Sequence, residues 1–462
     1  MFELDKKSNL LELPEHRYQL KEVDEARMFR EFYPYEEIPK IAFNNVHVPV
    51  NMPSEIWITD TTFRDGQQSR APYTADQIVK IYKLLNRLGG PKGIIRQTEF
   101  FLYSEQDRRA ALECMNLGYD FPEVTSWIRA SKKDFQFVKE MGIKETGILV
   151  SCSDYHIFHK LHMKRGEAIE HYLGVVKDCI EAGVKPRCHF EDITRADIFH
   201  FVIPFARELM KLMGETGVPI KIRACDTMGY GVSYPGAMIP RSVHGIIYNL
   251  HKDADVPHTL LEWHGHNDFY RAVANSTTAW LYGASAVNCS LFGIGERTGN
   301  TPLEAMVFEY AQLKGTLDGM DPTAITELAE YYERELGEVI PPRTPFVGKN
   351  FNVTRAGIHA DGLLKNEEIY NIFDTGKILN RPPRVAISNT SGLAGIAHWM
   401  NSNPALYAYK GIDKNNPLCI YLKDWVDEQY AQGRVTVITD EELEELIHAY
   451  EKICLLYTSD AA

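Results

Sequence analysis

Eight short apolar or β-branched runs recur along the chain from residue 56 onward. They lie near residues 56–60, 94–98, 121–125, 145–150, 184–190, 218–224, 258–263 and 286–291. Helical periodicity fills most of the intervals between them, as at 75–88, 131–141, 165–182 and 198–216. Eight strands alternating with helices over about 240 residues are typical of a (β/α)8 TIM barrel. The alternative, a doubly wound open sheet, usually has fewer strands and a glycine-rich turn after the first one, and that turn is missing here.

The chain of 462 residues suits one such barrel with an appendage. Residues 1–54 carry prolines and aromatics, and we expect a partly helical extension that wraps the main domain or a partner subunit. The barrel is predicted at 55–318, a linker helix with a smaller mixed subdomain at 319–410, and a helical C-terminal segment at 411–454. Residues 455–462 break the pattern and are interpreted as a non-native tail.

Composition narrows the class of protein. Hydrophobic residues make up 44% and charged residues 24% of the chain, as in soluble globular proteins. No apolar run approaches the roughly 20 residues of a membrane helix. The eight cysteines form no CxxC pair, which favours reduced thiols in a cytoplasmic protein. A net charge of −13 argues against a nucleic-acid partner.

The motif His264-Gly-His266 follows the apolar run that ends at Trp263. Side chains alternate along a strand, so both imidazoles point to the same side of an extended backbone. Such a pair offers two nitrogen ligands to one divalent cation, although a simple hydrogen-bonded histidine pair is the ordinary alternative. Asp65, at the end of another predicted strand, adds a carboxylate. Together the three side chains suit Mg²⁺, Mn²⁺ or Zn²⁺ with open positions for a 2-oxo acid.

Polar and ionisable side chains also follow the other predicted strands, where catalytic residues of such barrels lie. Arg64 is expected near negative charge that develops on an enolate or alkoxide. Arg187 suits a substrate carboxylate, although an ion pair with Glu191 is the structural alternative. The loop Gly293–Asn300 has backbone N–H groups free to approach an acyl or phosphate oxygen, but turns need glycine as well. Further polar side chains at predicted strand ends are Glu99, Arg129, Ser153, His156, His189, Asp226 and Thr227.

A second polar cluster lies beyond the barrel, in the glycine-flanked segment Ala356–Gly362. His359 and Asp361, with Tyr370 farther on, could complete a site that the barrel builds. A hydrogen-bonded turn at the corner of a subdomain would need the same residues.

Five motifs, in this order, resemble those of the DRE-TIM metallolyases. They are Asp60-x-x-x-Arg64-Asp65-Gly66-x-Gln68, Glu191-Asp192-x-x-Arg195, Asp226-Thr227-x-Gly229, His264-x-His266-Asn267-Asp268 and Gly293-Ile294-Gly295-Glu296-Arg297-x-Gly299-Asn300. The chain is most similar to the branch of 2-isopropylmalate, homocitrate and citramalate synthases, over about residues 56–400. The resemblance implies a TIM-barrel acyltransferase that condenses acetyl-CoA with a 2-oxo acid and hydrolyses the thioester. It also implies a divalent metal, acetyl-CoA as co-substrate, and a homodimer in which the subdomain reaches the active site of the neighbouring subunit.

The same resemblance suggests roles for individual residues. Asp65, His264 and His266 would bind the metal, with Asn300 as a further ligand or close neighbour. Arg64, Glu191, His359 and Tyr370 would be catalytic, the last two in moving the methyl proton of acetyl-CoA. The residues expected to bind substrate are Gln68, Glu99, Arg187, His189 and Thr227.

Some residues depart from the family pattern near the acceptor pocket. His189 stands where relatives often carry a small hydroxyl residue, and Glu99 is followed by Phe100-Phe101 in place of a Gly-Phe-Pro turn. A 2-isopropylmalate synthase is the main interpretation, with Trp127, Phe100 and Phe101 against the isopropyl group. The alternative is a homocitrate synthase or a Re-type citrate synthase that uses 2-oxoglutarate or oxaloacetate, which extra basic side chains would suit. A lyase of the 3-hydroxy-3-methylglutaryl-CoA type is disfavoured because the loop 293–300 has no cysteine. A catalytically inactive binding module is also disfavoured, because all three predicted metal ligands are present.

Overall fold

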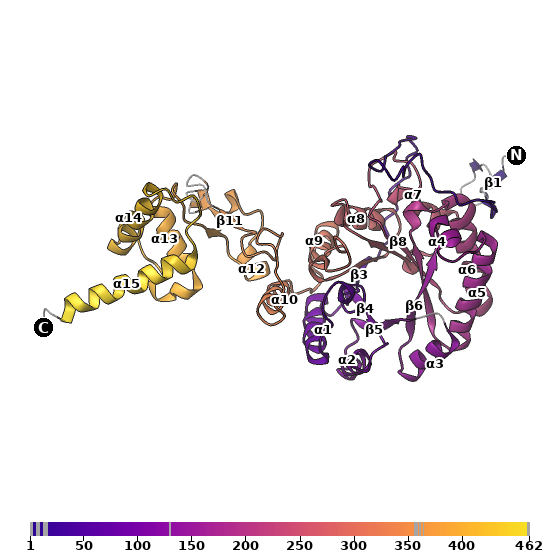
Figure 1. Ribbon diagram of the computed structural model, residues 1–462, viewed down its shortest axis with the longest axis horizontal. Coiled ribbons are helices and arrows are strands. Elements are labelled where there is room, and N and C mark those ends of the chain that lie inside the picture. The colour runs from indigo at the N-terminus through magenta and orange to yellow at the C-terminus, as the bar shows by residue number, and fades with distance from the viewer. Residues whose placement is uncertain are drawn as a thin grey trace. The chain divides into compact units, whose positions relative to one another are not determined.

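The computed structural model describes residues 3–5, 10–12, 17–128, 131–354, 359, 362–363 and 365–459. The chain divides into two compact units, Met1–Asp321 and Pro322–Ala462 (Figure 1). The division falls close to the predicted end of the barrel at residue 318. Among the described residues, no helix combines the length and the apolar character that crossing a bilayer requires.

Eight parallel strands of the first unit close into a barrel in the order β10-β3-β4-β5-β6-β7-β8-β9 (Figure 1). The predicted TIM barrel is therefore confirmed, and the open sheet is excluded because β10 pairs with β3. The strands are β3 Trp57–Asp60, β4 Ile95–Phe101, β5 Glu123–Trp127, β6 Glu145–Ser151, β7 Lys185–Glu191, β8 Lys221–Asp226, β9 Leu261–Gly265 and β10 Ala286–Cys289.

Helices follow the strands and surround the barrel (Figure 1). They are α1 Ala75–Gly89, α2 Glu105–Asn116, α3 Lys132–Glu140, α4 Asp154–His159, α5 Arg165–Glu181, α6 Ile203–Thr216, α7 Val243–Lys252, α8 Ala272–Tyr282 and α9 Leu303–Lys314. Residues 198–202, predicted as the start of a helix, form a π-helical turn that leads into α6. Capping boxes at Thr74 and Ser104 begin α1 and α2, because each side chain accepts from the third backbone N–H of its helix.

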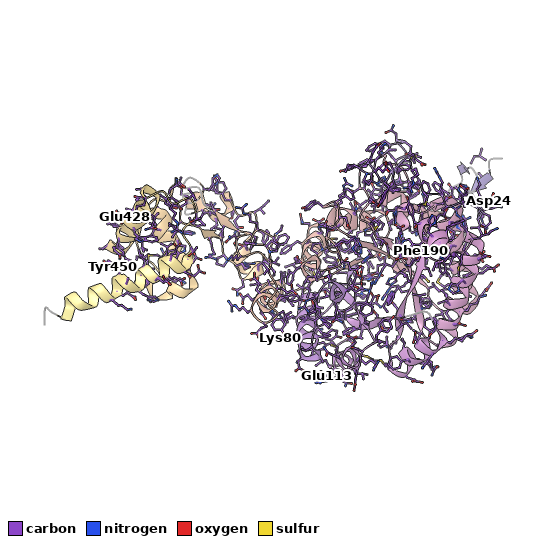
Figure 2. All side chains as sticks on the ribbon, in the orientation of Figure 1. Asp24, Lys80, Glu113, Phe190, Glu428 and Tyr450 are labelled. Atoms are coloured by element: carbon purple, nitrogen blue, oxygen red, sulfur yellow. The ribbon has the colours of Figure 1, made fainter. Side chains whose placement is uncertain are left out.

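Side chains alternate between the two faces of each barrel strand. On β7, Phe190 points outward and stacks on Phe205 of α6 with ring centroids 5.1 Å apart. Phe190 is labelled on the first unit in Figure 2. Its neighbours Arg187 and His189 point inward, where Arg187 donates to Glu145 of β6 at 2.7 Å. The inside of this barrel is thus polar, and its charges are held in ion pairs, as burial requires.

The extension ahead of the barrel wraps the first unit but has no helix in its described part, residues 17–54. Prolines at 34, 39, 49 and 53 remove backbone donors there, which explains why the partly helical prediction is wrong. Contacts with the barrel fix the segment. Lys21 N donates to His200 O at 3.1 Å, and Met238 N donates to Ala42 O at 2.8 Å. Short strands β1 Glu3–Asp5 and β2 Leu10–Glu12 pair antiparallel.

The second unit is mostly helical. Pro322 takes the N-cap position of α10. The segment predicted as helical at 411–454 contains two helices, and the chain turns between them at Gly433 with φ +94°. Its last helix runs to Ser459, past residue 454, and residues 460–462 lie outside the description. The elements are α10 Thr323–Arg334, β11 Val353–Thr354, α12 Thr375–Leu379, β12 Arg384–Val385, α13 Leu393–Ser402, α14 Pro417–Ala431 and α15 Asp440–Ser459.

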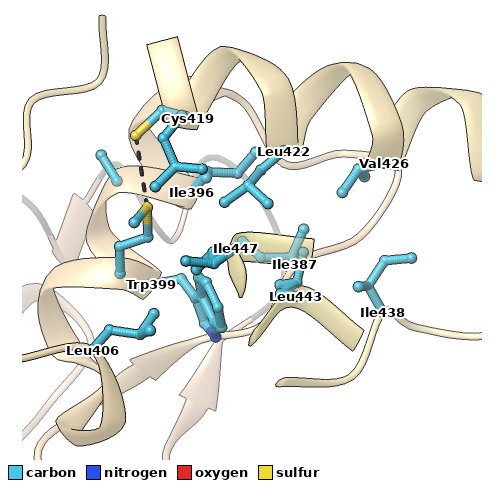
Figure 3. Close-up of a cluster of buried hydrophobic side chains, with 13 residues drawn as sticks. Ile387, Ile396, Trp399, Leu406, Cys419, Leu422, Val426, Ile438, Leu443 and Ile447 are labelled. Atoms are coloured by element: carbon cyan, nitrogen blue, oxygen red, sulfur yellow. Dashed lines mark hydrogen bonds between the residues drawn. The ribbon is translucent and has the colours of Figure 1, made fainter. Parts of the chain in front are cut away.

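One apolar cluster forms the core of this second unit (Figure 3). Trp399 of α13 packs beside Leu422 of α14 and Ile447 of α15, and all three are almost completely buried. The indole N–H of Trp399 donates to Asp440 at 2.8 Å, which ties α13 to the start of α15. These helices are therefore held together by a core of their own.

Candidate metal centre and active site

Asp65, His264 and His266 meet at the C-terminal end of the barrel. Their ligand atoms all lie within 4.8 Å of one another, and all three side chains are buried. His264 Nε2 is 3.1 Å from His266 Nε2, and Asp65 Oδ2 is 3.6 Å and 3.8 Å from the two nitrogens. The turn after β3 brings Asp65 to this position, since its N–H donates to Thr61 O at 2.9 Å. A carboxylate and two imidazoles predicted to converge from distant segments do converge.

The electrostatics keep these three groups ready to bind a cation. Burial lowers the pKa of His264, and it lowers that of His266 to about 3 with help from the neighbouring His264. Both rings are therefore neutral at pH 7, with a lone pair available. Burial by itself would raise the pKa of Asp65, but Arg64 and the two imidazoles hold it well below its ordinary value. The carboxylate is therefore ionised.

The donor set fits a divalent metal. Asn300 donates from Nδ2 to Asp65 Oδ2 at 2.9 Å, and its buried Oδ1 has no hydrogen-bond partner among the described residues. An amide oxygen left without a donor beside a carboxylate and two imidazoles is an oxygen ligand suited to Mg²⁺ or Mn²⁺, and the imidazoles also suit Zn²⁺. Asn300 thus lies where a fourth ligand or a close neighbour was predicted.

The glycine-rich loop Gly293–Asn300 is held in a compact form beside this centre. Gly299 has φ +87°, and a Cβ there would lie 2.0 Å from Gly293 O, so only glycine fits. Asn267 N donates to Gly299 O at 2.9 Å, which ties the loop to the end of β9. Arg297 pairs with Asp268 at 2.9 Å. The glycines therefore shape the loop that presents Asn300.

Glu99 and Arg187, predicted to bind substrate at the strand ends, lie deeper in the barrel. Arg187 is the third of seven residues in β7, is fully buried, and pairs with Glu99 and Glu145. Glu99 also accepts hydrogen bonds from Arg64 Nε at 2.7 Å and from Arg223 Nη1 at 3.2 Å. Several of the charged side chains predicted at the strand ends therefore belong to a network of ion pairs inside the barrel. The alternative pairing of Arg187 with Glu191 is wrong, because the two residues lie four positions apart on β7, about 13 Å along the strand.

Comparison with known proteins agrees with this geometry. A family described as "HMGL-like" matches residues 55–331. The chain is 59% identical to a citrate (Re)-synthase of Clostridium kluyveri over 93% of its own length and 95% of that protein. It is 56% identical to a citrate (Re)-synthase of Syntrophus aciditrophicus over 94% of its length and 69% of that protein. The chain belongs to the HMGL-like family.

A more distant relative of the chain is 2-isopropylmalate synthase 2 of Caldanaerobacter subterraneus. It is 31% identical, over 74% of this chain and 84% of that protein. These matches confirm the DRE-TIM resemblance and the predicted class of enzyme, an acyltransferase of the citrate and isopropylmalate synthase type. They favour the Re-type citrate synthase alternative over the main interpretation as a 2-isopropylmalate synthase.

Other predicted residues of this HMGL-like site lie around the rim of the barrel. Glu191 ends β7, accepts from Ser151, and lies 3.2 Å from His156 Nδ1. Thr227 Oγ1 accepts from Asp192 N at 2.8 Å. Gln68 lies in the turn after Asp65 with its side chain exposed. Their proposed roles in substrate binding and catalysis stay predictions.

The predicted catalytic pair of the second unit also lies close together. The rings of His359 and Tyr370 have centroids 4.5 Å apart, and both residues are exposed. Asp361 and most of the glycine-flanked segment lie outside the described residues, as does Arg129 in the first unit.

Two partners in the site were not predicted. Asn288 of β10 lies 2.8 Å from Nδ1 of His264, and Arg223 of β8 joins Glu99 to Glu262 of β9. Each lies at an inward position of a predicted strand, so the alternation of side chains contains the signal. Their partners depend on strand register, which the periodicity leaves open.

Proposed function

We propose that this chain is a Re-type citrate synthase that condenses acetyl-CoA with oxaloacetate and then hydrolyses the thioester. The observation that carries the proposal is the identity of 59% and 56% with two citrate (Re)-synthases over nearly the whole chain. The convergence of Asp65, His264 and His266 supports it, because the chemistry needs a cation site beside open space for a 2-oxo acid.

We assign the binding of a divalent metal to Asp65, His264 and His266, with Asn300 at its side. Such a metal would polarise the ketone of the acceptor as a Lewis acid. Arg64 is held between Glu99 Oε2 at 2.7 Å and Asp65 Oδ1 at 3.0 Å. Its fixed guanidinium would stabilise negative charge as the carbon–carbon bond forms. Thr227 and Glu191, at the rim, are the proposed contacts of the acceptor.

His359 and Tyr370 are proposed to move the proton of the acetyl-CoA methyl group. Their rings contact each other, so the phenol can orient the imidazole. We also propose a homodimer as the working unit, with this pair serving a neighbouring subunit. The proposed domains follow the sequence: an extension to residue 54, the barrel to 318, the subdomain to 410 and a helical segment beyond it.

The second candidate is a 2-isopropylmalate synthase. Its support is the identity of 31% with a 2-isopropylmalate synthase and the aromatic wall formed by Phe101 and Trp127, whose ring centroids are 5.8 Å apart. An isopropyl group would pack on such a wall. The lower identity ranks this candidate second.

A thiol-release assay tests the proposal. The purified protein, supplied with Mg²⁺, Mn²⁺ or Zn²⁺, is given acetyl-CoA with oxaloacetate, 2-oxoglutarate, 2-oxoisovalerate or pyruvate. We expect the highest kcat/KM with oxaloacetate, and preference for 2-oxoisovalerate would overturn the assignment. Citrate made from labelled acetyl-CoA and cleaved by a citrate lyase of known stereochemistry then reports the face of attack.

The metal assignment needs its own test. Asp65→Asn keeps the shape of the side chain but removes its charge, so we expect loss of Mn²⁺ binding in calorimetry and loss of CoA release. Circular dichroism of the variant should stay native. His251→Asn, on α7 and outside the centre, is the control. Tight Mn²⁺ binding by Asp65→Asn would exclude Asp65 as a ligand.

A further inference from the structure

Tyr33 belongs to the extension ahead of the barrel, yet it packs against the loop that follows β8. Only 4% of the residue is exposed, whereas Tyr35, two residues on, is 90% exposed. The Tyr33 hydroxyl donates to Thr194 O, and its ring centroid lies 5.0 Å from that of Tyr230. The family match begins at residue 55, so this contact comes from outside the matched part of the chain. The extension therefore reaches the loops at the end of the barrel that holds the metal centre.

Arg241 joins the extension to the same loop. Its Nη1 donates to Lys40 O, and its Nε donates to Tyr230 O at 2.8 Å. The guanidinium carbon lies 6.0 Å from the ring centroid of Tyr33 and 5.7 Å from that of Tyr230. Arg241 is 2% exposed, and no carboxylate in the described part of the chain forms an ion pair with it. A buried cation without a counterion is costly, so the two carbonyl oxygens and the two rings have to stabilise its charge.

Hydrogen bonds connect these contacts to Asp226, the last residue of β8. Asp226 Oδ1 accepts from Tyr230 N at 2.9 Å and from Thr194 Oγ1 at 2.8 Å. Thr194 is also the residue whose backbone oxygen accepts from Tyr33. The backbone oxygen of Asp226, in turn, accepts from His266 N at 3.3 Å. Tyr33 is thus connected through Thr194 and Asp226 to one of the assigned metal ligands.

The loop after β8 also lies directly against the chain that carries His266. Gly229 has φ +64°, and a Cβ there would lie 3.0 Å from Asp268 N and 3.1 Å from His266 O. Such close contact means that a shift of the loop would displace His266 as well. The shift would also move Thr227, the proposed contact of the acceptor. Misplacement of a reacting or binding group by about 1 Å can lower a rate by about 100-fold.

We propose that Tyr33 and Arg241 are positioning residues, which hold the loop 227–231 in the geometry that the active site needs. The kinetic part of this inference rests on the proposed function, and its metal-binding part rests on the metal assignment alone. Without the two side chains, the loop loses its contacts with the extension, and Thr227 and His266 lose a support. Groups that orient a metal ligand typically contribute about 10- to 100-fold to metal affinity or activity. The extension then acts on the reaction through the loop.

The test compares variants of two adjacent buried residues in the full-length chain. Tyr33→Leu removes the ring and the hydroxyl, and Tyr33→Phe removes only the hydroxyl. Phe32→Leu is the matched control, because Phe32 is also 4% exposed and its ring lies beside those of Phe29 and Tyr33. We expect Tyr33→Leu to weaken Mn²⁺ binding in calorimetry by about 10-fold. Its kcat/KM for the acceptor that the wild type prefers should fall by about 10- to 100-fold, with KM for acetyl-CoA unchanged.

Conservative variants and melting temperatures separate positioning from a general loss of stability. Tyr33→Phe should keep most of the Mn²⁺ affinity and of kcat/KM, because the ring contact with Tyr230 remains. Arg241→Met should act in the same direction as Tyr33→Leu. Arg241→Lys should fall between Arg241→Met and the wild type, since a point charge does not reach both carbonyl oxygens. Phe32→Leu should lower the melting temperature about as much as Tyr33→Leu while leaving Mn²⁺ affinity and kcat/KM near their wild-type values.

Each outcome bears on one of the two proposals. Equal effects of Tyr33→Leu and Phe32→Leu on Mn²⁺ affinity and kcat/KM would refute the positioning role, as would the absence of any effect of Tyr33→Leu. A wild type that binds Mn²⁺ but prefers an acceptor other than oxaloacetate would refute the proposed function. The positioning role would still be tested in that case, because Mn²⁺ affinity is measured without substrate.

Discussion

His264 and Asn288 are register partners on neighbouring strands, and the Asn288 amide oxygen lies 2.8 Å from Nδ1 of the imidazole. The other end of the amide donates to Thr59 Oγ1 at 2.9 Å, which fixes which atom of the amide faces the ring. Nδ1 must then carry the proton, so the lone pair on Nε2 points to the metal centre. A pairing between β9 and β10 thus sets the tautomer of a ligand.

The first prediction concerns this contact. Asn288→Ala should weaken Mn²⁺ binding by about 10- to 100-fold, since a ligand histidine that loses its partner is free to rotate or change tautomer. Calorimetric titration measures the affinity. Asn249→Ala, on α7 and away from the centre, is the matched control. Equal affinities in wild type and Asn288→Ala would show that packing alone orients His264.

The second prediction concerns Arg64. Arg64→Lys should lower kcat by about 10-fold or more with little change in KM for the acceptor, because a point charge cannot reach both Glu99 and Asp65 as the planar fork does. Steady-state kinetics with varied acceptor separate the two constants. Arg109→Lys, on the surface of α2, serves as control. A rise in KM alone would make Arg64 a binding residue.

The third prediction concerns pH and stability. Burial raises the pKa of Glu304, at the start of α9, from 4.5 to about 7. The folded protein therefore keeps a proton that the unfolded chain loses above about pH 4.5. The stabilisation of the folded protein by this bound proton is fully present below pH 4.5. As the pH rises to about 7 it is lost, and the free energy of unfolding falls by about 3 kcal/mol.

Glu304→Gln should remove this loss. The amide oxygen can still accept from Phe292 N, as the carboxyl does at 3.0 Å. We expect equal melting temperatures near pH 4.5 and a more stable variant at pH 8. Glu309→Gln, half-buried on the same helix, is the control. A variant that is less stable than wild type at pH 8 would mean that burial does not penalise the ionised form of Glu304.

The fourth prediction tests the proposed dimer. If His359 serves a neighbouring subunit, mixing inactive His359→Ala with inactive Asp65→Asn should restore activity, because some mixed dimers contain one intact site. CoA release after subunit exchange measures it. Mixing Asp65→Asn with His264→Ala, both altered in the barrel, should restore nothing. Failure of the first mixture while subunits exchange would place His359 in the site of its own chain.

The alternation of apolar runs and helices determined the TIM barrel, because strand and helix periodicities depend only on local order along the chain. The spacing of His264 and His266 determined a shared face for the same reason. Their meeting with Asp65, nearly two hundred residues earlier in the sequence, followed from the closed barrel together with the resemblance of five motifs.

Only the tertiary structure determined how deep each inward-facing side chain lies in the barrel and which residues it contacts. Arg187, His189 and Glu191 share one face of one strand, yet the first is held in ion pairs, the second accepts from Arg187 and the third lies at the rim. Periodicity fixes the face of a strand but not the register between strands, and register determines which charges meet. For that reason the contacts of Asn288 and Arg223 could be identified only from the pairing of β8, β9 and β10.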